Sequence, residues 1–234
     1  MTVLVLGASG ATGRRVVEQL LGRGLSVRAM VRSPELFLNS IGEHERLSVI
    51  HASILELSDE ALVQHLCSCT AVISCLGHTL SFKGVYGQPR WLVTEATRRV
   101  CALIKGLQRT EPVKFILMNS TGCRNPDLGE KVSFVETCVV GLIRQLVPPH
   151  ADNERAVEHL RQVIGSEDSS VACGVEWVAV RPDSLVDEQQ VSEYRVCPSP
   201  TRSAIFNSGK SSRINVAHFM VELVVGAKEV VHAG

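Results

Sequence analysis

The chain carries no excess of charge of either sign. Its 234 residues contain 24 Lys and Arg and 24 Asp and Glu, and the pI of the sequence is about 7.1. Nucleic-acid-binding and membrane-surface proteins concentrate positive charge, so this balance predicts neither partner. Apolar runs of the roughly twenty residues that span a bilayer are also missing. A strand pattern starts within two residues of Met1, so we expect no leader segment.

Paired cysteine motifs are the second absence. Zinc sites are typically built from two closely spaced pairs of ligands such as Cys-x-x-Cys, and no such set occurs here, so we expect no metal site. Several cysteines fall in apolar strand or helix patterns, where a thiol behaves as a small hydrophobe. We therefore predict free thiols and a reducing, cytoplasmic location. The eight cysteines lie at positions 67, 69, 75, 101, 123, 138, 173 and 197.

The first thirteen residues contain the most informative pattern that is present. An apolar strand, Val3–Leu6, leads into Gly7-x-x-Gly10-x-x-Gly13, and apolar residues then recur at helical spacing. A strand, a glycine turn and a helix in this order aim the helix N-terminus at a pyrophosphate. We expect Gly7 to permit the tight turn, Gly10 to let the backbone approach the phosphates and Gly13 to let the helix lie close to the strand. The pattern predicts a dinucleotide site.

The end of the next strand indicates which dinucleotide binds. Enzymes that use NAD place Asp or Glu there for the ribose 2′-hydroxyl, about twenty residues beyond the glycines. This chain has Arg32 followed by Ser33. A guanidinium forks onto a 2′-phosphate, and a neighbouring hydroxyl can add a hydrogen bond. The alternative is a solvated arginine at a strand end. We predict NADP(H) as the cofactor.

Strand and helix patterns alternate along the whole chain, which predicts a doubly wound parallel sheet with helices on both faces, the Rossmann α/β fold. We expect one domain over 1–234, in which residues from about 182 to 234 contribute a small cap on the substrate side. The predicted strands are 3–7, 25–31 (ending before Pro34), 47–51, 70–76, 113–119 and 175–181. The predicted helices are 11–23, 58–66 with Ser58 as N-cap, about 88–108, about 131–146, 152–164 and about 216–227.

Ligands of such a sheet bind at the carboxyl ends of its strands, so the loops that follow the strands are candidate binding segments. An ordinary polar turn is the alternative for each loop taken singly. By strand order, we expect the adenine beside Ser53 and Ile54, the ribose above Leu76 and Gly77, and the nicotinamide beside Asn119 and Ser120, walled by Pro182 and Leu185.

The chain resembles, over nearly its full length, the atypical short-chain dehydrogenase/reductases, a group that includes flavin/biliverdin-IXβ reductases and nitrogen-metabolite-repressor-like sensors. The resemblance implies that Ser9, Ala11 and Thr12 line the pyrophosphate and that Arg32 and Ser33 take the 2′-phosphate. Ser53 stands near the position where the family offers an Asp to the adenine. The motifs that carry the resemblance are residues 7–13, Val31-Arg32-Ser33, Ser120-Thr121-Gly122, the strand from Gly174 to Pro182, and Ile214-Asn215-Val216-Ala217.

The catalytic pair of most of that superfamily is missing. It is Tyr-x-x-x-Lys, in which the Lys lowers the pKa of the Tyr. The chain has two tyrosines: Arg90 follows Tyr86 at this spacing but in the wrong part of the fold, and no Lys follows Tyr194. The usual alcohol dehydrogenase machinery is therefore absent, as is common in the atypical group.

Few residues could replace the pair. Ser120 is a candidate to hydrogen-bond a substrate carbonyl, and His150 is a candidate proton donor. A strand-end turn and a surface histidine are the corresponding structural alternatives. We interpret Asp152 as the N-cap of the following helix. His78 is a candidate to flank the nicotinamide or an ordinary loop residue.

Three functions agree with these observations. The first is an NADPH-dependent oxidoreductase that passes hydride to a small conjugated acceptor such as a flavin, quinone or enone, because such acceptors carry their own electron sink. The second is a non-catalytic NADP(H)-sensing regulatory or assembly protein. The third is a sugar-nucleotide epimerase or dehydratase, which would need the missing pair. We expect a small-molecule substrate, and the sequence leaves the oligomeric state and any protein partner open.

Overall fold

The centre of the molecule is a six-stranded sheet in the order β3-β2-β1-β4-β5-β6, and every neighbouring pair of strands is parallel. The computed structural model describes residues 1–78, 87–123, 125, 129–130, 139–142, 147–164, 174–203 and 205–226. The predicted doubly wound α/β fold is confirmed. The six strands are β1 (Thr2–Leu6), β2 (Ser26–Val31), β3 (Leu47–His51), β4 (Ala71–Ser74), β5 (Val113–Met118) and β6 (Val175–Val180).

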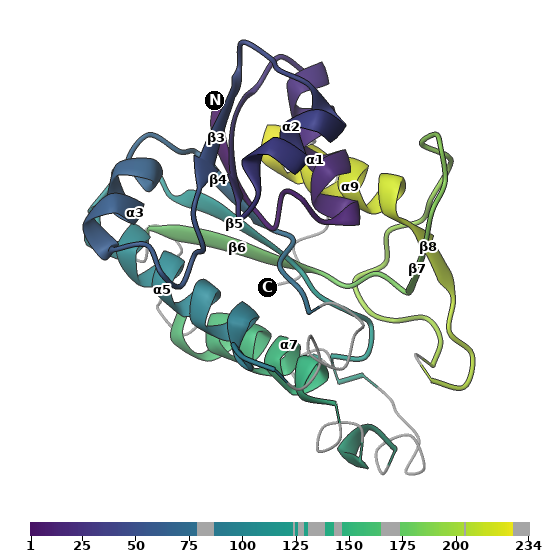
Figure 1. Cartoon of the computed structure of the whole chain (residues 1–234). Coiled ribbons are helices and arrows are strands. Elements are labelled where there is room, and N and C mark those ends of the chain that lie inside the picture. Colours follow the sequence, from purple (N-terminus) through teal and green to yellow (C-terminus); the bar gives the residue numbers. More distant parts are fainter. Residues whose placement is uncertain are drawn as a thin grey trace.

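Helices cover both faces of this sheet (Figure 1). On one face lie α1 (Ala11–Gly22), α2 (Pro34–Ile41) and α9 (Arg213–Val225); on the other lie α3 (Asp59–Leu66), α5 (Leu92–Gly106) and α7 (Pro148–His159), which continues as a π-helical turn over Leu160–Ile164. Two three-residue strands, β7 (Ser184–Val186) and β8 (Lys210–Ser212), pair in a separate small sheet.

The two-faced burial follows from the strand sequences. In β1, Leu4 and Leu6 pack into the core under α3, α5 and α7, whereas Val3 and Val5 pack into the core under α1 and α9. All four side chains are fully or almost fully buried. Alternate residues of a strand point to opposite faces, so a continuous apolar run is what a doubly covered strand requires.

Several boundaries differ from the prediction, mainly because of proline. Pro34 begins α2, a helix that the prediction omits, since proline suits the first helical position. Pro148 likewise starts α7 four residues earlier than predicted. The helix predicted from 88 begins at Leu92, and the last helix begins at Arg213 rather than 216. Of the helix predicted over 131–146, the described residues 139–142 are helical and the rest lies outside the described residues.

Asp152 corrects a predicted role. The N-cap of α7 is Val147, and Asp152 lies inside α7 with no exposed surface. Its carboxylate accepts hydrogen bonds from the backbone N–H groups of Val93 and Thr94, both at 2.8 Å, in the first turn of α5. A ring nitrogen of His78 lies 2.9 Å from the same carboxylate. Asp152 therefore caps α5 from another helix, and His78 joins the β4 loop to this cap.

The pKa of Asp152 reflects two opposed effects. Burial raises the pKa of this carboxyl. Hydrogen bonds from His78, Thr94 and Val93 to the carboxylate lower the pKa by a larger amount, so it lies below the usual 3.8. The carboxylate is thus the form that the fold stabilises.

The segment after residue 182 divides into two parts. Residues 184–203 and 205–212 lie beyond the carboxyl end of the sheet, around β7 and β8 (Figure 1). In contrast, α9 packs beside α1 against the sheet. The Ser212 hydroxyl caps its N-terminus by accepting from the N–H of Asn215, and Lys114 Nζ reaches the carbonyl of Leu223, 3.0 Å away, at its C-terminal end.

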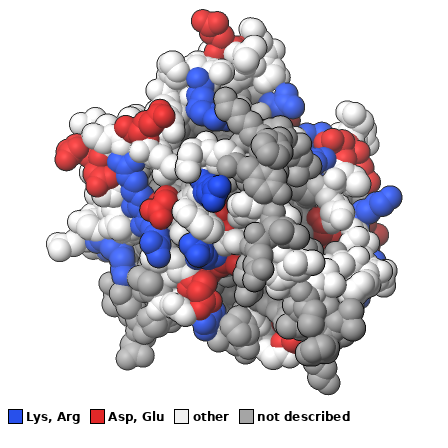
Figure 2. Space-filling view, turned by 60° about the horizontal axis from the view of Figure 1, so that its bottom comes forward, with Lys and Arg blue, Asp and Glu red and all other residues white. Residues whose placement is uncertain are grey.

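The surface shows the charge balance of the composition. Figure 2 shows Lys and Arg interspersed with Asp and Glu over the face in view. In the described ranges, no helix combines the length and hydrophobicity needed to cross a membrane, and no cluster of three or more His, Cys, Asp and Glu is placed to hold a metal ion. Cys67, Cys69, Cys75 and Cys197 are free thiols, and burial raises the pKa of Cys75 to about 12. Cys138 and Cys173 lie outside the described residues.

Candidate functional site

Because the six strands are parallel, their carboxyl ends meet at one edge of the sheet. All the predicted cofactor residues follow strand ends at this edge. They are Gly7, Ser9, Gly10, Ala11, Thr12 and Gly13 after β1, Arg32 and Ser33 after β2, Ser53 and Ile54 after β3, Leu76 and Gly77 after β4, Asn119 after β5, and Pro182 and Leu185 after β6.

The three glycines of the β1–α1 turn have different surroundings. Gly7 has φ +71°, and a Cβ there would lie 2.6 Å from the carbonyl oxygen of Cys75. A Cβ on Gly13 would overlap the carbonyl oxygen of Gly7 and reach 3.0 Å from Cα of Ala8. A Cβ on Gly10 would meet only the Gly7 carbonyl, at 3.2 Å. The fold therefore requires glycine at 7 and 13, whereas a Cβ at 10 would fit if the Gly7 carbonyl shifted by a few tenths of an ångström.

The N-terminus of α1 is suited to an anion. Its N-cap is Gly10, which supplies no side-chain cap, and no acidic residue lies in its first turn. Ser9 and Ala11 are exposed there, and the side chain of Thr12 is buried. Uncapped N–H groups and the positive end of the helix dipole favour a phosphate at this position.

Arg32 and Ser33 are exposed side by side at the end of β2. Within the described residues, Arg32 forms no hydrogen bond or ion pair. Ser33 is the N-cap of α2, but its hydroxyl makes no capping hydrogen bond. A guanidinium and a hydroxyl are thus both accessible to a ligand at the carboxyl end of the sheet. They follow β2, which is the neighbour of β1 and therefore lies beside the glycine turn.

The ends of β3 and β4 give a mixed result for the predicted contacts. Ser53 is half-buried, and its carbonyl accepts from the N–H groups of Glu56 and Leu57. Ile54 is only 4% exposed and packs in the core, so its side chain is largely inaccessible to a ligand. Leu76 is half-buried, whereas Gly77 is exposed and a Cβ there would have no neighbour within 4 Å. Space for a ligand is therefore open above Gly77.

The ends of β5 and β6 enclose a cavity of about 230 Å³ that holds both predicted catalytic residues. Ser120 Oγ accepts from the N–H of Gly122, 3.1 Å away. A Cβ on Gly122 would lie 3.3 Å from this Oγ and 3.2 Å from Cε1 of His150, so the two side chains flank the same glycine. The structure thus brings Ser120 and His150 together. The other lining residues are Asn119, Thr121, Val140, Pro182, Asp183, Ser184, Leu185 and Ile205.

Residues of α7 and the β5 loop lie close to this pair. Asn119 donates from its side chain to the carbonyl of Asn153 on α7, at 3.0 Å, and accepts from the N–H of Ser120, at 2.8 Å. His150 Nε2 lies 3.5 Å from a carboxylate oxygen of Glu154, one turn further along α7. The β5 loop is therefore held against the helix that carries His150. The side-chain amide of Asn119 is used mainly for this contact.

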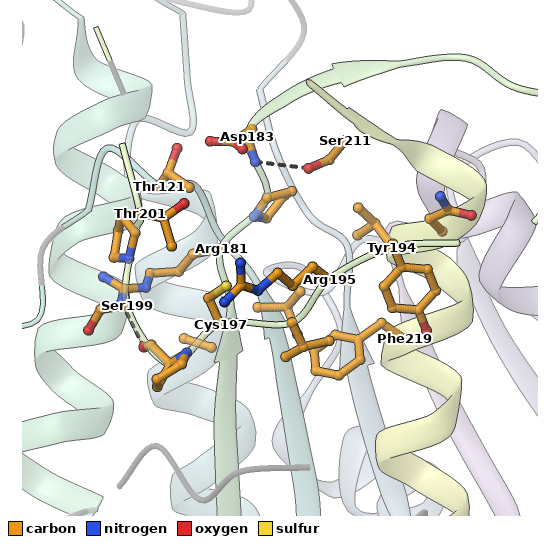
Figure 3. A pocket seen from close by; sticks show the side chains of 18 of the residues that line it. Thr121, Arg181, Asp183, Tyr194, Arg195, Cys197, Ser199, Thr201, Ser211 and Phe219 are labelled. Atoms are coloured by element: carbon orange, nitrogen blue, oxygen red, sulfur yellow. Dashed lines mark hydrogen bonds between the residues drawn. The ribbon is translucent and has the colours of Figure 1, made fainter. Parts of the chain in front are cut away.

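A second cavity, of about 590 Å³, extends along β6 on the other side of the β6 loop (Figure 3). Thr121, Pro182 and Asp183 line both cavities. In Figure 3, Tyr194 and Phe219 lie on one side of the larger cavity, and Thr121 and Thr201 lie on the other. No pattern in the sequence indicates this cavity, because a large part of its wall comes from residues 188–202, which form no helix or strand.

Tyr194, which lines the larger cavity, is held by residues of α9. The hydroxyl of Tyr194 lies 2.7 Å from Nδ1 of His218 on α9, and its ring packs edge-on against Phe219. Burial, together with the nearby Glu222 carboxylate, raises the pKa of Tyr194. Tyr86 lies outside the described residues.

The sheet order, the glycine turn and the open edge define a doubly wound protein of the dinucleotide-binding class. A sequence model of the family described as NAD(P)H-binding matches residues 7–225. The chain belongs to this NAD(P)H-binding family.

A curated relative covers only a short segment. An uncharacterised chloroplastic protein of Arabidopsis thaliana is 43% identical over 58 residues, which are 25% of this chain and 21% of that protein. The match therefore spans about a fifth of the relative's length.

Solved structures share the fold over nearly the whole chain. A protein from Streptococcus pneumoniae assigned as an NADH-flavin reductase is 19% identical, with a TM-score of 0.69 and coverage of 98% of this chain and 95% of that one. The anaerobilin reductase ChuY of Escherichia coli O157:H7 is 18% identical, with a TM-score of 0.61 and coverage of 97% and 92%. Gre2 of Candida albicans, solved with NADPH, is 15% identical, with a TM-score of 0.67 and coverage of 99% and 76%. The family match and these folds confirm the resemblance to the atypical short-chain dehydrogenase/reductases.

Proposed function

We propose that the protein is an NADPH-dependent reductase that passes hydride to a small conjugated acceptor. The observation that carries this proposal is the cavity of about 230 Å³ at the ends of β5 and β6, which contains both Ser120 and His150. In a doubly wound sheet this is the end of the switch-point crevice that lies farthest from the adenine half. Membership of the NAD(P)H-binding family supports a nicotinamide cofactor in that crevice.

The residues present suit this cofactor. The pyrophosphate would lie at the N-terminus of α1, against Gly10 with Ser9, Ala11 and Thr12, where N–H groups are uncapped. Arg32 and Ser33 would hold the 2′-phosphate and so favour NADPH over NADH. The open space above Gly77 leaves room for the ribose. Ser53 would approach the adenine, and Pro182 and Leu185 would wall the nicotinamide.

When bound, the cofactor supplies a hydride, so that NADPH, the acceptor and one proton give NADP and the two-electron-reduced acceptor. Ser120 would donate a hydrogen bond to the acceptor oxygen. His150 would deliver the proton and regain one from solvent. Glu154 would hold the His150 ring in place from the Nε2 side.

The chemistry of the acceptor follows from what is missing. No Lys lies four residues after either tyrosine, and the hydroxyl of Tyr194 is bound to His218. A flavin, quinone or enone delocalises the incoming electron pair and therefore depends less on such a pair than a simple ketone does. The segment after residue 182 would form the substrate side of the site, as predicted for a cap.

A panel of acceptors tests the proposal directly. The loss of NADPH absorbance would be followed with flavins, quinones and enones as acceptors. We expect turnover with at least one class. His150→Gln should lower kcat about a hundredfold with NADPH binding unchanged, and Ser120→Ala should lower it by a similar factor. Tight NADPH binding without turnover of any acceptor would contradict a reductase and favour the regulatory alternative.

The remaining predictions concern the setting of the protein. A small-molecule substrate agrees with the two cavities. The free thiols at Cys67 and Cys197 agree with a reducing compartment, and the cytoplasmic location stays a prediction.

A further inference from the structure

The larger cavity has no part in the hydride transfer proposed above, although it adjoins the site. It runs along β6, the edge strand of the sheet, from Pro182 at the carboxyl end to Trp177 near the start of the strand. Its volume of about 590 Å³ is in the range of cavities that bind drug-sized ligands. Thr121, Pro182 and Asp183 form a wall common to both cavities. A ligand that is longer than the smaller cavity would therefore extend into the larger one.

The larger cavity is lined by polar and charged residues together with several apolar side chains. Val157 of α7, Trp177 and Val180 of β6, and Phe219 of α9 contribute side chains to it. Val196 also lines it and is 45% exposed, so its side chain is accessible to a ligand in the cavity.

The charged residues that line the larger cavity carry both signs, so they favour neither an anionic nor a cationic ligand. The cations Arg195, Arg202 and Lys210 are matched in number by the anions Asp183, Glu188 and Glu193. The two other cations are already paired, Arg161 with Glu158 and Arg181 with Glu130. An anionic or cationic ligand would thus meet like as well as opposite charges, whereas an uncharged group that packs against the apolar side chains avoids this repulsion.

We propose that the acceptor is a two-part molecule, an uncharged conjugated ring that carries an apolar tail. The ring is reduced in the smaller cavity beside Ser120 and His150, and the tail lies in the larger cavity along β6. This inference rests on the proposed reductase function. The redox balance is that given above: one hydride from NADPH and one proton from His150 reach the ring, and the tail is unchanged.

A series of 2-alkyl-1,4-naphthoquinones tests the tail site. Burial of one methylene contributes at most about a fourfold gain in affinity. Between the methyl and the hexyl compound we therefore expect KM to fall by at least about tenfold, allowing for incomplete burial, with little change in kcat. Val196→Asp should remove most of this dependence and leave the KM of the methyl compound unchanged.

Val191→Asp is the matched control. Val191 is 43% exposed, belongs to the same segment and does not line the cavity, so this variant should keep the wild-type dependence on tail length. Both positions are exposed, so both variants should fold. Equal KM values across the series in the wild type, or the same loss in both variants, would overturn the inference.

Turnover of the methyl compound separates the two proposals. If it is reduced but tail length has no effect, the reductase function stands and the tail site is wrong. If no quinone is reduced, the proposed function fails for this acceptor class, and quenching of Trp177 fluorescence still measures tail binding. Trp91→Phe would leave Trp177 as the single tryptophan for this titration. Quenching that is independent of tail length would then overturn the tail site as well.

Discussion

Single residues in the β1–α1 turn have separable roles. Gly7 and Gly13 are surrounded so closely by the chain that a side chain would collide with backbone atoms. Gly10 has φ −71° and ψ 163°, a conformation open to any residue, and a Cβ there would need only a small shift of the Gly7 carbonyl. Only the pyrophosphate that we place against it gives a strong reason for glycine at this position.

Alanine substitutions should separate these roles. Gly13→Ala should lower the free energy of unfolding by about 3 kcal/mol, because overpacking here cannot relax. Gly10→Ala should change it by less than about 1 kcal/mol, yet weaken NADPH binding about tenfold to a hundredfold, the equivalent of 1–3 kcal/mol of steric conflict with the phosphates. Chemical denaturation and a binding titration measure the two effects. Unchanged NADPH affinity in a folded Gly10→Ala protein would remove the pyrophosphate from this turn.

Arg32 carries the prediction of cofactor preference. Arg32→Ala should weaken NADPH binding roughly tenfold to a hundredfold, since a charge-assisted hydrogen bond contributes about 1.5–3 kcal/mol. NADH binding should hardly change. Arg32→Asp should favour NADH, because a carboxylate repels the 2′-phosphate and accepts from a ribose hydroxyl. A parent protein that prefers NADH would show that the arginine has another role. Arg28, which donates to the carbonyl of His65 away from this edge, offers a control position.

These residues could be predicted from the sequence because their chemistry is local. Three glycines in a turn after a strand and an arginine at the end of the next strand are patterns that predict a dinucleotide site in a doubly wound sheet. Prediction failed where the partner lies far along the chain. Nothing near Asp152 in the sequence indicates that its carboxylate reaches Val93 and Thr94, or that His78 lies beside it.

At the level of elements, the cap on α5 is the main unexpected feature. The residue at its N-cap position, Trp91, makes no side-chain hydrogen bond, so the first turn depends on a carboxylate from α7. The ring of Trp91 instead receives the guanidinium of Arg155, 3.9 Å from its centre. The two helices are thus joined through polar groups at one end and through Val93, Val100, Ala156 and Leu160 in the core.

Asp152→Asn should therefore destabilise the fold at neutral pH. The amide can accept one of the two backbone hydrogen bonds but leaves a buried N–H group without its partner, so we expect a loss of about 2–4 kcal/mol. Asp59→Asn is a suitable control, because Asp59 is exposed and its ion pair with Arg99 contributes at most about 1 kcal/mol. Urea denaturation measures both. A loss no larger than that of the control would show that the cap is dispensable.

The stability difference between the wild type and Asp152→Asn should depend on pH. The pKa of Asp152 is lowered in the folded state, so its contribution is complete above the unfolded value near 3.8 and disappears as the pH falls through the lower folded value. The stability difference between wild type and Asp152→Asn should accordingly be constant at neutral pH and narrow below about pH 4. A difference that stays constant to pH 2 would contradict this assignment.

Elements with a clear apolar pattern were predictable. The ends of β5 and α1 were placed within one residue of those observed. In contrast, β7 and β8 have three residues each, too few to show a period of two. Pro34 was interpreted as the end of a strand, although proline also begins helices, and only the burial of Phe37 against the sheet decides between these.

At the scale of the whole molecule, cofactor binding should be visible as stability. A ligand present at a hundred times its Kd and bound only to the folded state adds about 2.7 kcal/mol. For a chain of this length this corresponds to a rise in Tm of roughly 5–11 °C. We expect this shift with NADPH and a smaller one with NADH at the same concentration. In Gly10→Ala the NADPH shift should fall to about 0.4–1.4 kcal/mol, as a tenfold to hundredfold weaker affinity requires. Equal shifts with both cofactors would leave the fold assignment intact and reject the preference for the phosphate.

The cap on α5 also sets an order of events during synthesis. Asp152 follows Val93 by 59 residues, so at about 5–20 residues per second the ribosome adds it roughly 3–12 s after Val93. During this interval the first turn of α5 can satisfy its N–H groups only with water. In a nascent chain in which α5 has been synthesised but α7 has not, we therefore expect the first turn of α5 to remain without its cap. The cap forms when the Asp152 carboxylate has been synthesised and α7 packs against α5.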